Sequence, residues 1–253
     1  MMMNEDTPIR STVALLPSAL VTGILAGLLV APAHADEEEG WWYGGSLAAT
    51  SDYIFRGVSQ TDESPAIQGS LDFGHSNGFY AGVWASNVDF DDPDGIDIEV
   101  DIYAGWVFAF ENDTELDLQW VRYLYPGANE GFGINYNEFI AAYSFLDNYT
   151  ATVAWTDDLS RSDESAFYYN LGAEYELGVA ELNLVLGAGY NDVSNAAGSD
   201  FWDFQVGVNR DFGMINADLS YFDTSGFDAD VQDFFGPKSW ADARIVLTFS
   251  MEF

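Results

Sequence analysis

Cysteine is absent from the 253 residues, and basic residues are rare, with 7 Lys and Arg against 42 Asp and Glu. Without cysteine the chain forms no disulfides, so its stability must come from packing and backbone pairing. The formal net charge of -35 argues against nucleic acid as a partner, because phosphate binding needs clustered Lys and Arg. Hydrophobic residues make up 48% and aromatic residues 16% of the chain. We therefore expect a folded protein rather than a disordered acidic one.

Long apolar runs are also scarce, since only residues 13–30 form one. Arg10 precedes this run, and Ala33-His34-Ala35 follows it as a small-residue cleavage site. These features predict a secretory signal peptide over residues 1–35, with a membrane-anchoring helix as the alternative. The mature domain is then residues 36–253. A mean hydropathy of -0.04 excludes several membrane helices, so any span of a membrane by this domain must use strands.

Apolar and polar residues alternate with period two along much of the mature chain. In residues 96–110 one parity is wholly apolar, whereas the other begins with Asp97, Glu99 and Asp101. Successive side chains of a strand point to opposite faces, so this pattern predicts a strand with one apolar and one polar face. We predict twelve such strands, at residues 43–56, 65–74, 79–88, 96–110, 115–125, 136–146, 149–157, 165–177, 181–191, 200–211, 214–223 and 239–253.

The connections between the predicted strands alternate in length. Short turns such as 75–78 and 147–148 are followed by longer polar loops such as 89–95 and 158–164. Short turns on one rim and longer loops on the other are typical of outer-membrane barrels. A soluble sandwich would need two apolar faces around a dry core, and the polar face carries too many carboxylates for that. We predict an all-β fold, a transmembrane antiparallel up-and-down β-barrel of about 12 strands after a cleaved signal peptide.

The last predicted strand alternates up to its final residue. Ile245, Leu247, Phe249, Met251 and Phe253 share one face. A terminal Phe on such a strand resembles the signal read by the outer-membrane barrel assembly machinery, which assigns Phe253 as the assembly signal. The expected location is the bacterial outer membrane, with membrane lipid, lipopolysaccharide and that machinery as partners.

Several motifs in the first half of the mature chain resemble the opening of the TorF-type putative porins. They are SDYIFRGVSQT at residues 51–61, PAIQG at 65–69, GFYAGVWASNVDF at 78–90, IEVDIYAG at 98–105 and YLYPG at 123–127. The later half is similar mainly in its strand pattern. The resemblance implies an outer-membrane barrel and putative porin, without a defined substrate.

Strict parity gives the predicted barrel an acidic lumen with few basic residues. The predicted pore-lining residues are Asp52, Arg56, Asp72, Asp97, Glu99, Asp101, Asp117, Glu138, Glu174, Asp203, Asp218, Asp242 and Arg244. Charged side chains that line a pore set its ion preference, which predicts a cation-preferring channel for ions or small hydrophilic solutes. Alternatively the inward side chains fill the interior, and the chain is a non-conducting structural or adhesion barrel with acidic surface loops.

Two arginines and three aromatic residues extend this interpretation. Parity turns Arg122 and Arg210 toward lipid, either reaching a membrane interface near a strand end or displaced by a bulge. The same parity turns Trp84, Tyr103 and Tyr168 inward, where exposed rings would allow sugars to stack.

We expect no enzymatic activity, cofactor or metal. His75 is the only histidine after residue 35, and it lies in a short turn on the predicted periplasmic rim, away from the rim where lipid hydrolases act. The acidic stretch 89–97 lacks the residue spacing of a calcium loop.

Overall fold

The computed structural model describes residues 40–90 and 95–253, so the predicted signal peptide lies outside the described residues. Within them, twelve strands form a closed antiparallel barrel, as predicted. The barrel strands are β1 (Trp41–Thr50), β4 (Ala66–His75), β5 (Phe79–Asn87), β6 (Ile98–Ala109), β7 (Glu115–Leu124), β8 (Tyr136–Phe145), β9 (Tyr149–Thr156), β10 (Ala166–Glu176), β11 (Asn183–Asp192), β12 (Phe201–Phe212), β13 (Ile215–Ser225) and β14 (Arg244–Glu252).

The barrel closes where the first and last strands meet. Ser46 to Thr50 of β1 pair with Glu252 to Thr248 of β14. The backbones of Gly45 and Phe253 then exchange two hydrogen bonds, with N···O distances of 2.9 and 3.0 Å. Closure leaves no strand edge, which is the condition for a sheet to cross a bilayer.

Side chains alternate between the lumen and the outer surface in every barrel strand. In β12 the residues from Phe201 to Asn209 with odd numbers are buried, whereas Trp202, Phe204 and Val206 between them are exposed. Large apolar side chains are exposed on the other strands too, including Ile102, Leu171 and Leu247. A soluble protein would not leave such a continuous apolar band in water, so this band is the lipid-facing surface of a membrane barrel.

Aromatic rings gather on the outer surface near both rims of the barrel. Near the short turns, Phe79 lies 6.3 Å from Trp106 between ring centroids. Near the opposite rim, Tyr190 lies 4.8 Å from Trp202, and Phe139 lies 6.0 Å from Trp155. These two groups occupy the positions of the interfacial girdles that flank a bilayer's apolar band.

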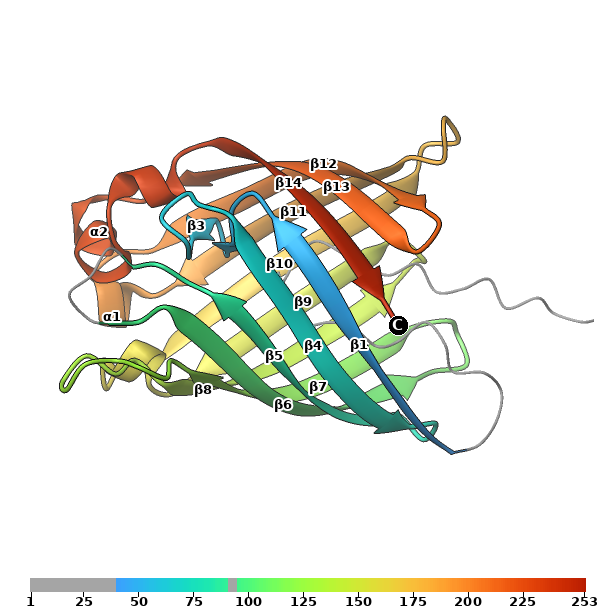
Figure 1. Ribbon diagram of the computed structural model, residues 1–253, viewed down its shortest axis with the longest axis horizontal. Coiled ribbons are helices and arrows are strands. Elements are labelled where there is room, and N and C mark those ends of the chain that lie inside the picture. Colours follow the sequence, from blue (N-terminus) through green and yellow to red (C-terminus); the bar gives the residue numbers. More distant parts are fainter. Residues whose placement is uncertain (1–39, 91–94) are drawn as a thin grey trace, which may run out of the picture.

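The two rims differ as the connection lengths predict. Short turns join β4 to β5, β6 to β7, β8 to β9, β10 to β11 and β12 to β13, and we call this end the turn rim. The other end, the loop rim, carries α1 (Ser194–Ala197), α2 (Ala229–Phe235), η1 (Leu159–Arg161) and η2 (Lys238–Ala241) (Figure 1). None of the helices in the described part of the chain is long and apolar enough to cross a membrane.

Two predicted strands were too long at their loop-rim ends. The strand predicted at 43–56 ends at Thr50, because the chain then turns into the lumen, where β2 (Ile54–Phe55) pairs with β3 (Val58–Ser59). The strand predicted at 239–253 begins only at Arg244, because residues 238–241 form a helical turn after Pro237. Alternation of residue types continues into both segments, so the sequence pattern alone does not mark these ends.

The lipid-facing band predicts how two equivalent positions of β13 respond to charge. Leu219, near the middle of the strand, and Ile215, at the turn rim, point outward and are each 47% exposed. Leu219→Arg is expected to lower the free energy of unfolding in lipid vesicles by about 2–4 kcal/mol, and Ile215→Arg by about 0–1 kcal/mol. Equal losses in denaturant unfolding would contradict the assignment of the band.

Candidate functional site

The lumen contains an inserted segment, residues 51–65, which we call the plug. It leaves β1 at the loop rim, folds into the barrel as the β2–β3 hairpin and returns to β4. Tyr53, Val58 and Thr61 in the plug are each at most 2% exposed. Residues 52–61 are buried or half-buried, whereas Ser51 and residues 62–65 are exposed at the loop rim. A connection of this kind normally lies on the surface, so the burial of residues 52–61 places them in the loop-side half of the lumen.

Asp52 anchors the first turn of the plug. Its Oδ1 accepts hydrogen bonds from the hydroxyls of Ser59 at 2.6 Å and Thr61 at 3.0 Å. Its Oδ2 accepts from Nη1 of Arg244, the first residue of β14, at 2.6 Å. A further hydrogen bond joins Nε1 of Trp240 to Oδ1 of Asp62 at 2.7 Å. The plug is therefore tied to the loop-side end of β14 and to η2.

Arg56 connects the plug to β8 and β10 on the far side of the lumen from β1. Its Nη2 lies 2.7 Å from Oε2 of Glu138 on β8, and the two side chains are only 9% and 2% exposed. The guanidinium also lies 4.3 Å from the ring centroid of Tyr168 on β10. Tyr123 donates a second hydrogen bond to Glu138 at 3.0 Å. Charge pairing and ring stacking together compensate for burying this arginine.

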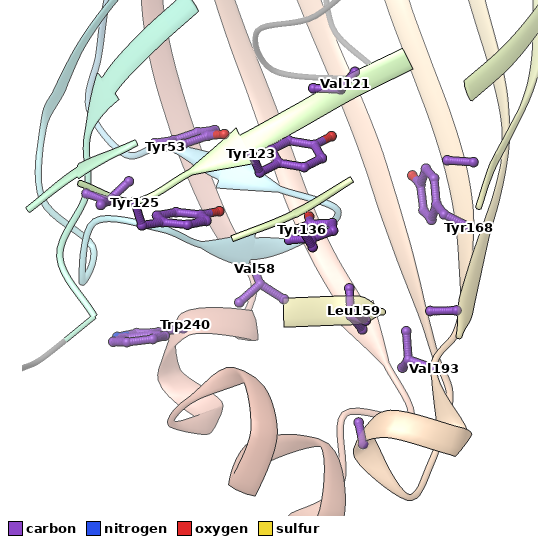
Figure 2. Packing of buried hydrophobic residues seen from close by; sticks show 14 of the residues in the cluster. Tyr53, Val58, Val121, Tyr123, Tyr125, Tyr136, Leu159, Tyr168, Val193 and Trp240 are labelled. Atoms are coloured by element: carbon purple, nitrogen blue, oxygen red, sulfur yellow. The ribbon is translucent and has the colours of Figure 1, made fainter. Parts of the chain in front are cut away.

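Tyrosines pack around the plug, and several of them donate hydrogen bonds to acidic residues of the loop-side half. Figure 2 shows Tyr123, Tyr125 and Tyr136 close to Tyr53 of the plug. The hydroxyl of Tyr125 donates to Oε1 of Glu99 at 3.1 Å. Burial, followed by the charge of Glu99, raises the pKa of Tyr125 and of Tyr53 well above the usual value. Both phenols therefore stay protonated and remain donors near neutral pH.

The turn-side half of the lumen has a different character. Four inward carboxylates lie there, and each accepts a hydrogen bond from a wall side chain. Tyr103 and Ser70 donate to Asp72, and Tyr80 donates to Asp117 at 2.8 Å. Asn209 donates to Glu174 at 3.0 Å, and Ser220 donates to Asp218 at 2.7 Å.

The turn-side half also retains contact with solvent. Inward residues such as Ser46, Asp117, Asp218 and Ser250 are half-buried, in contrast to the plug. Of the described Lys and Arg side chains, only Arg56 and Arg244 reach the lumen, and both lie in the loop-side half. The lumen thus consists of an acidic vestibule at the turn rim and a packed plug above it.

The structure divides the predicted pore-lining residues into three groups. Those on the barrel wall are Asp72, Glu99, Asp101, Asp117, Glu138, Glu174, Asp203, Asp218 and Arg244. Asp52 and Arg56 belong to the plug rather than to a wall strand, because β1 ends at Thr50. Asp97 and Asp242 are exposed in connections that precede β6 and β14, so their placement on the wall was wrong.

The outward arginines and inward aromatic residues follow the predicted parity. Arg210 keeps its outward place near the turn rim, where it lies 2.7 Å from Glu181 and 4.9 Å from the Phe212 ring centroid. Trp84, Tyr103 and Tyr168 do point inward but are buried. Trp84 packs against Tyr53 of the plug, so these rings offer no open stacking surface for a sugar.

Neither the plug nor the tyrosines that donate to the lumen carboxylates were expected from the sequence pattern. Tyr80, Tyr123 and Tyr125 each place a hydroxyl on a lumen carboxylate. Tyr80 and Tyr123 lie at inward positions of their strands, so residue parity could have predicted that they face the lumen carboxylates. Positive φ angles at Arg56, Gly57, Asp62 and Glu63 shape the plug, and Gly57 was the local signal of a turn there.

A family model matches residues 34–253 of the sequence, which is most of the chain. The chain belongs to the Gcw_chp family. The family is described as bacterial proteins of unknown function, and that description does not use the TorF-type name. The sequence has no significant match among curated proteins.

Solved structures with a similar chain path include bacterial outer-membrane proteins. An outer membrane channel from Pseudomonas putida F1 is 12% identical, covers 89% of this chain and 100% of its own, and has a TM-score of 0.48. OprD from Pseudomonas aeruginosa is 11% identical over 86% of this chain and 66% of its own, with a TM-score of 0.40. LpxR from Salmonella typhimurium is 8% identical over 83% and 99%, with a TM-score of 0.43.

At these identities and TM-scores the similar structures do not decide what this member of the family does. Its location follows from its own surface instead. A bacterial barrel with an outward apolar band and two aromatic girdles lies in the outer membrane.

The buried ion pair of the plug and the exposed pair at the turn rim give a matched prediction. Arg56→Gln leaves Glu138 buried without its cation and is expected to cost about 3–5 kcal/mol of stability. Arg210→Gln breaks a pair whose side chains are 33% and 81% exposed, and is expected to cost at most about 1 kcal/mol. Denaturant unfolding in vesicles measures both.

The double variant Arg56→Gln/Glu138→Gln provides the control for this prediction. Removing both charges leaves no unpaired buried ion, so it should recover part of the loss of Arg56→Gln. If the double variant is less stable than Arg56→Gln alone, the loss in Arg56→Gln does not come mainly from the unpaired charge of Glu138.

Proposed function

We propose that this protein is an outer-membrane channel for ions or small hydrophilic solutes, with a preference for cations and a passage controlled by the plug. The observation that carries the proposal is the unequal filling of the lumen. The loop-side half is packed by the buried residues of the plug, mostly within 52–61. The wall of the turn-side half is polar, and Ser46, Asp117, Asp218 and Ser250 in it are half-buried, whereas Asp72 and Glu174 are buried. A barrel with a purely structural interior would gain stability by packing both halves.

The plug can move without opening the barrel. It is an insertion between β1 and β4, which pair directly along Trp41–Thr50 and Ala66–His75. Its contacts with the wall include the Arg56–Glu138 and Asp52–Arg244 ion pairs, the hydrogen bond that the Leu247 amide donates to the Ser51 hydroxyl, and ring contacts. Displacing the plug breaks these contacts but leaves every strand pairing of the wall in place. A segment that can leave the lumen while the wall stays intact is able to gate the passage, as mobile loops do in other proteins.

The charge of the lumen supports a preference for cations. The vestibule carries Asp72, Asp117, Glu174 and Asp218, and the inward arginines of the described residues are both paired with other carboxylates above it. A negative wall with low-dielectric surroundings concentrates cations and repels anions. The non-conducting structural or adhesion barrel stays the competing hypothesis, and the absence of enzymatic activity stays a prediction.

Single-channel recording tests this proposal. Residues 36–253 refolded into a planar bilayer are expected to give small conductance steps. In a KCl gradient the reversal potential should shift from zero toward the K⁺ equilibrium potential. The double variant Arg56→Gln/Glu138→Gln, which removes the ionic contact of the plug with β8, should raise the mean conductance severalfold.

Asp97→Asn/Asp242→Asn is the matched control, because these exposed carboxylates lie outside the wall and should leave both readouts unchanged. No conductance steps over many insertions of the wild type and the plug variant would favour the non-conducting barrel. A reversal potential shifted toward the Cl⁻ equilibrium potential would contradict the cation preference.

A further inference from the structure

The four vestibule carboxylates are regularly spaced around the barrel. Asp72 lies on β4, Asp117 on β7, Glu174 on β10 and Asp218 on β13. In the closed strand order, two strands separate each of these four from the next, including across the β1–β14 seam. The carboxylates therefore face the lumen from four sides of the wall.

The four carboxylates also lie at a similar depth. Asp72 is three residues from the turn-rim end of β4, and Asp218 is three residues from the start of β13. Asp117 and Glu174 are each two residues from the turn-rim ends of β7 and β10. Because these ends define one rim, the four form a ring near the mouth of the vestibule, which we call the carboxylate ring.

In one sector of the wall, two glycines make room for tyrosine rings that hold two of these carboxylates. Gly82 and Gly105 lie between Asp72 and Asp117, and a Cβ at either would overlap Tyr103 or Tyr80. These two tyrosines lie over the glycines and donate to Asp72 and Asp117. They hold both carboxylates against the wall and fix their direction.

The opposite side of the ring holds oxygen atoms that lack a partner. Glu174 is 8% exposed, and its Oε2 has no hydrogen-bond donor although Oε1 accepts from Asn209. Oδ2 of Asp218 is likewise buried without a donor. An inward carboxylate with an unused oxygen in a low-dielectric site is costly unless a positive charge or water approaches it. No described Lys or Arg side chain reaches this level.

We infer that the carboxylate ring is the cation-selecting constriction of the vestibule and binds small monovalent cations such as K⁺. The described residues hold no group of three or more carboxylates close enough to chelate a metal, so the ring attracts cations with their hydration shells from several sides. This inference rests on the proposed function, since it names the ligand class and the selecting residues of the same lumen.

The absence of cysteine from the chain provides a direct probe of the ring that does not require conductance. Ser250 points inward on β14, pairs with Asn216 two residues from Asp218, and is half-buried. In Ser250→Cys, the rates of reaction with a cationic and an anionic methanethiosulfonate are measured at low salt in vesicles. The ratio of cationic to anionic rates reports the local potential.

Neutralising the ring in this background with Asp72→Asn, Asp117→Asn, Glu174→Gln and Asp218→Asn should lower the rate ratio by about tenfold. Asp218→Asn alone, which keeps three carboxylates, should lower it by about threefold and decides the matter if the fourfold variant does not fold. Asp97→Asn/Asp242→Asn should leave it unchanged. An unchanged ratio in a folded ring variant overturns the inference.

The same variants separate this inference from the proposed function. A lowered ratio together with no conductance in the bilayer would uphold the ring as a cation site in a vestibule that does not conduct. Conductance with an unaltered reversal potential in the ring variants would uphold the channel and overturn the ring as its selecting element.

Discussion

The pairing of β1 with β14 is the contact on which the rest of the structure depends. A bilayer offers no water to satisfy a free strand edge, so every backbone donor and acceptor must be paired within the protein. Ser46–Thr50 against Thr248–Glu252, extended by the Gly45–Phe253 bonds, completes this pairing. Once the sheet is closed, each strand must turn alternate residues outward to lipid and inward to an enclosed space. The acidic lumen and the apolar band are two results of this one constraint.

Enclosing many carboxylates creates an energetic problem, and the two halves of the lumen meet it differently. In the loop-side half, Arg56 and Arg244 pair with Glu138 and Asp52, and tyrosine hydroxyls donate to Glu99 and Asp203. Packing there is dense because the plug brings its own aromatic side chains. In the turn-side half, solvent access and hydrogen-bond donors from the wall replace charge pairing. Because the lumen has few basic residues and both lie in the loop-side half, charge pairing is confined to the plug, and the vestibule stays acidic.

Much of this arrangement could be predicted from residue parity. Each of the twelve strands overlaps a range that the period-two pattern predicts, and Glu99, Asp101, Glu138 and Glu174 face inward as expected. The errors occur where alternation continues beyond the barrel. Asp52 and Arg56 continue the alternation of β1 up to residue 56. Residues in the plug and residues in the wall can have the same local pattern, so alternation alone does not distinguish them. Asp97 and Asp242 show the same effect in connections at the loop rim.

The sequence by itself determined the strand pattern, the two faces of the wall and the acidic character of the lumen, because these depend on residues two apart in one strand. Only the tertiary structure decided that residues 52–61 lie in the loop-side half, and that Asp72, Asp117, Glu174 and Asp218 meet in one ring. Such contacts join residues from strands far apart in the chain. They depend on the register of pairing around the closed barrel, to which every strand contributes and which no single segment encodes.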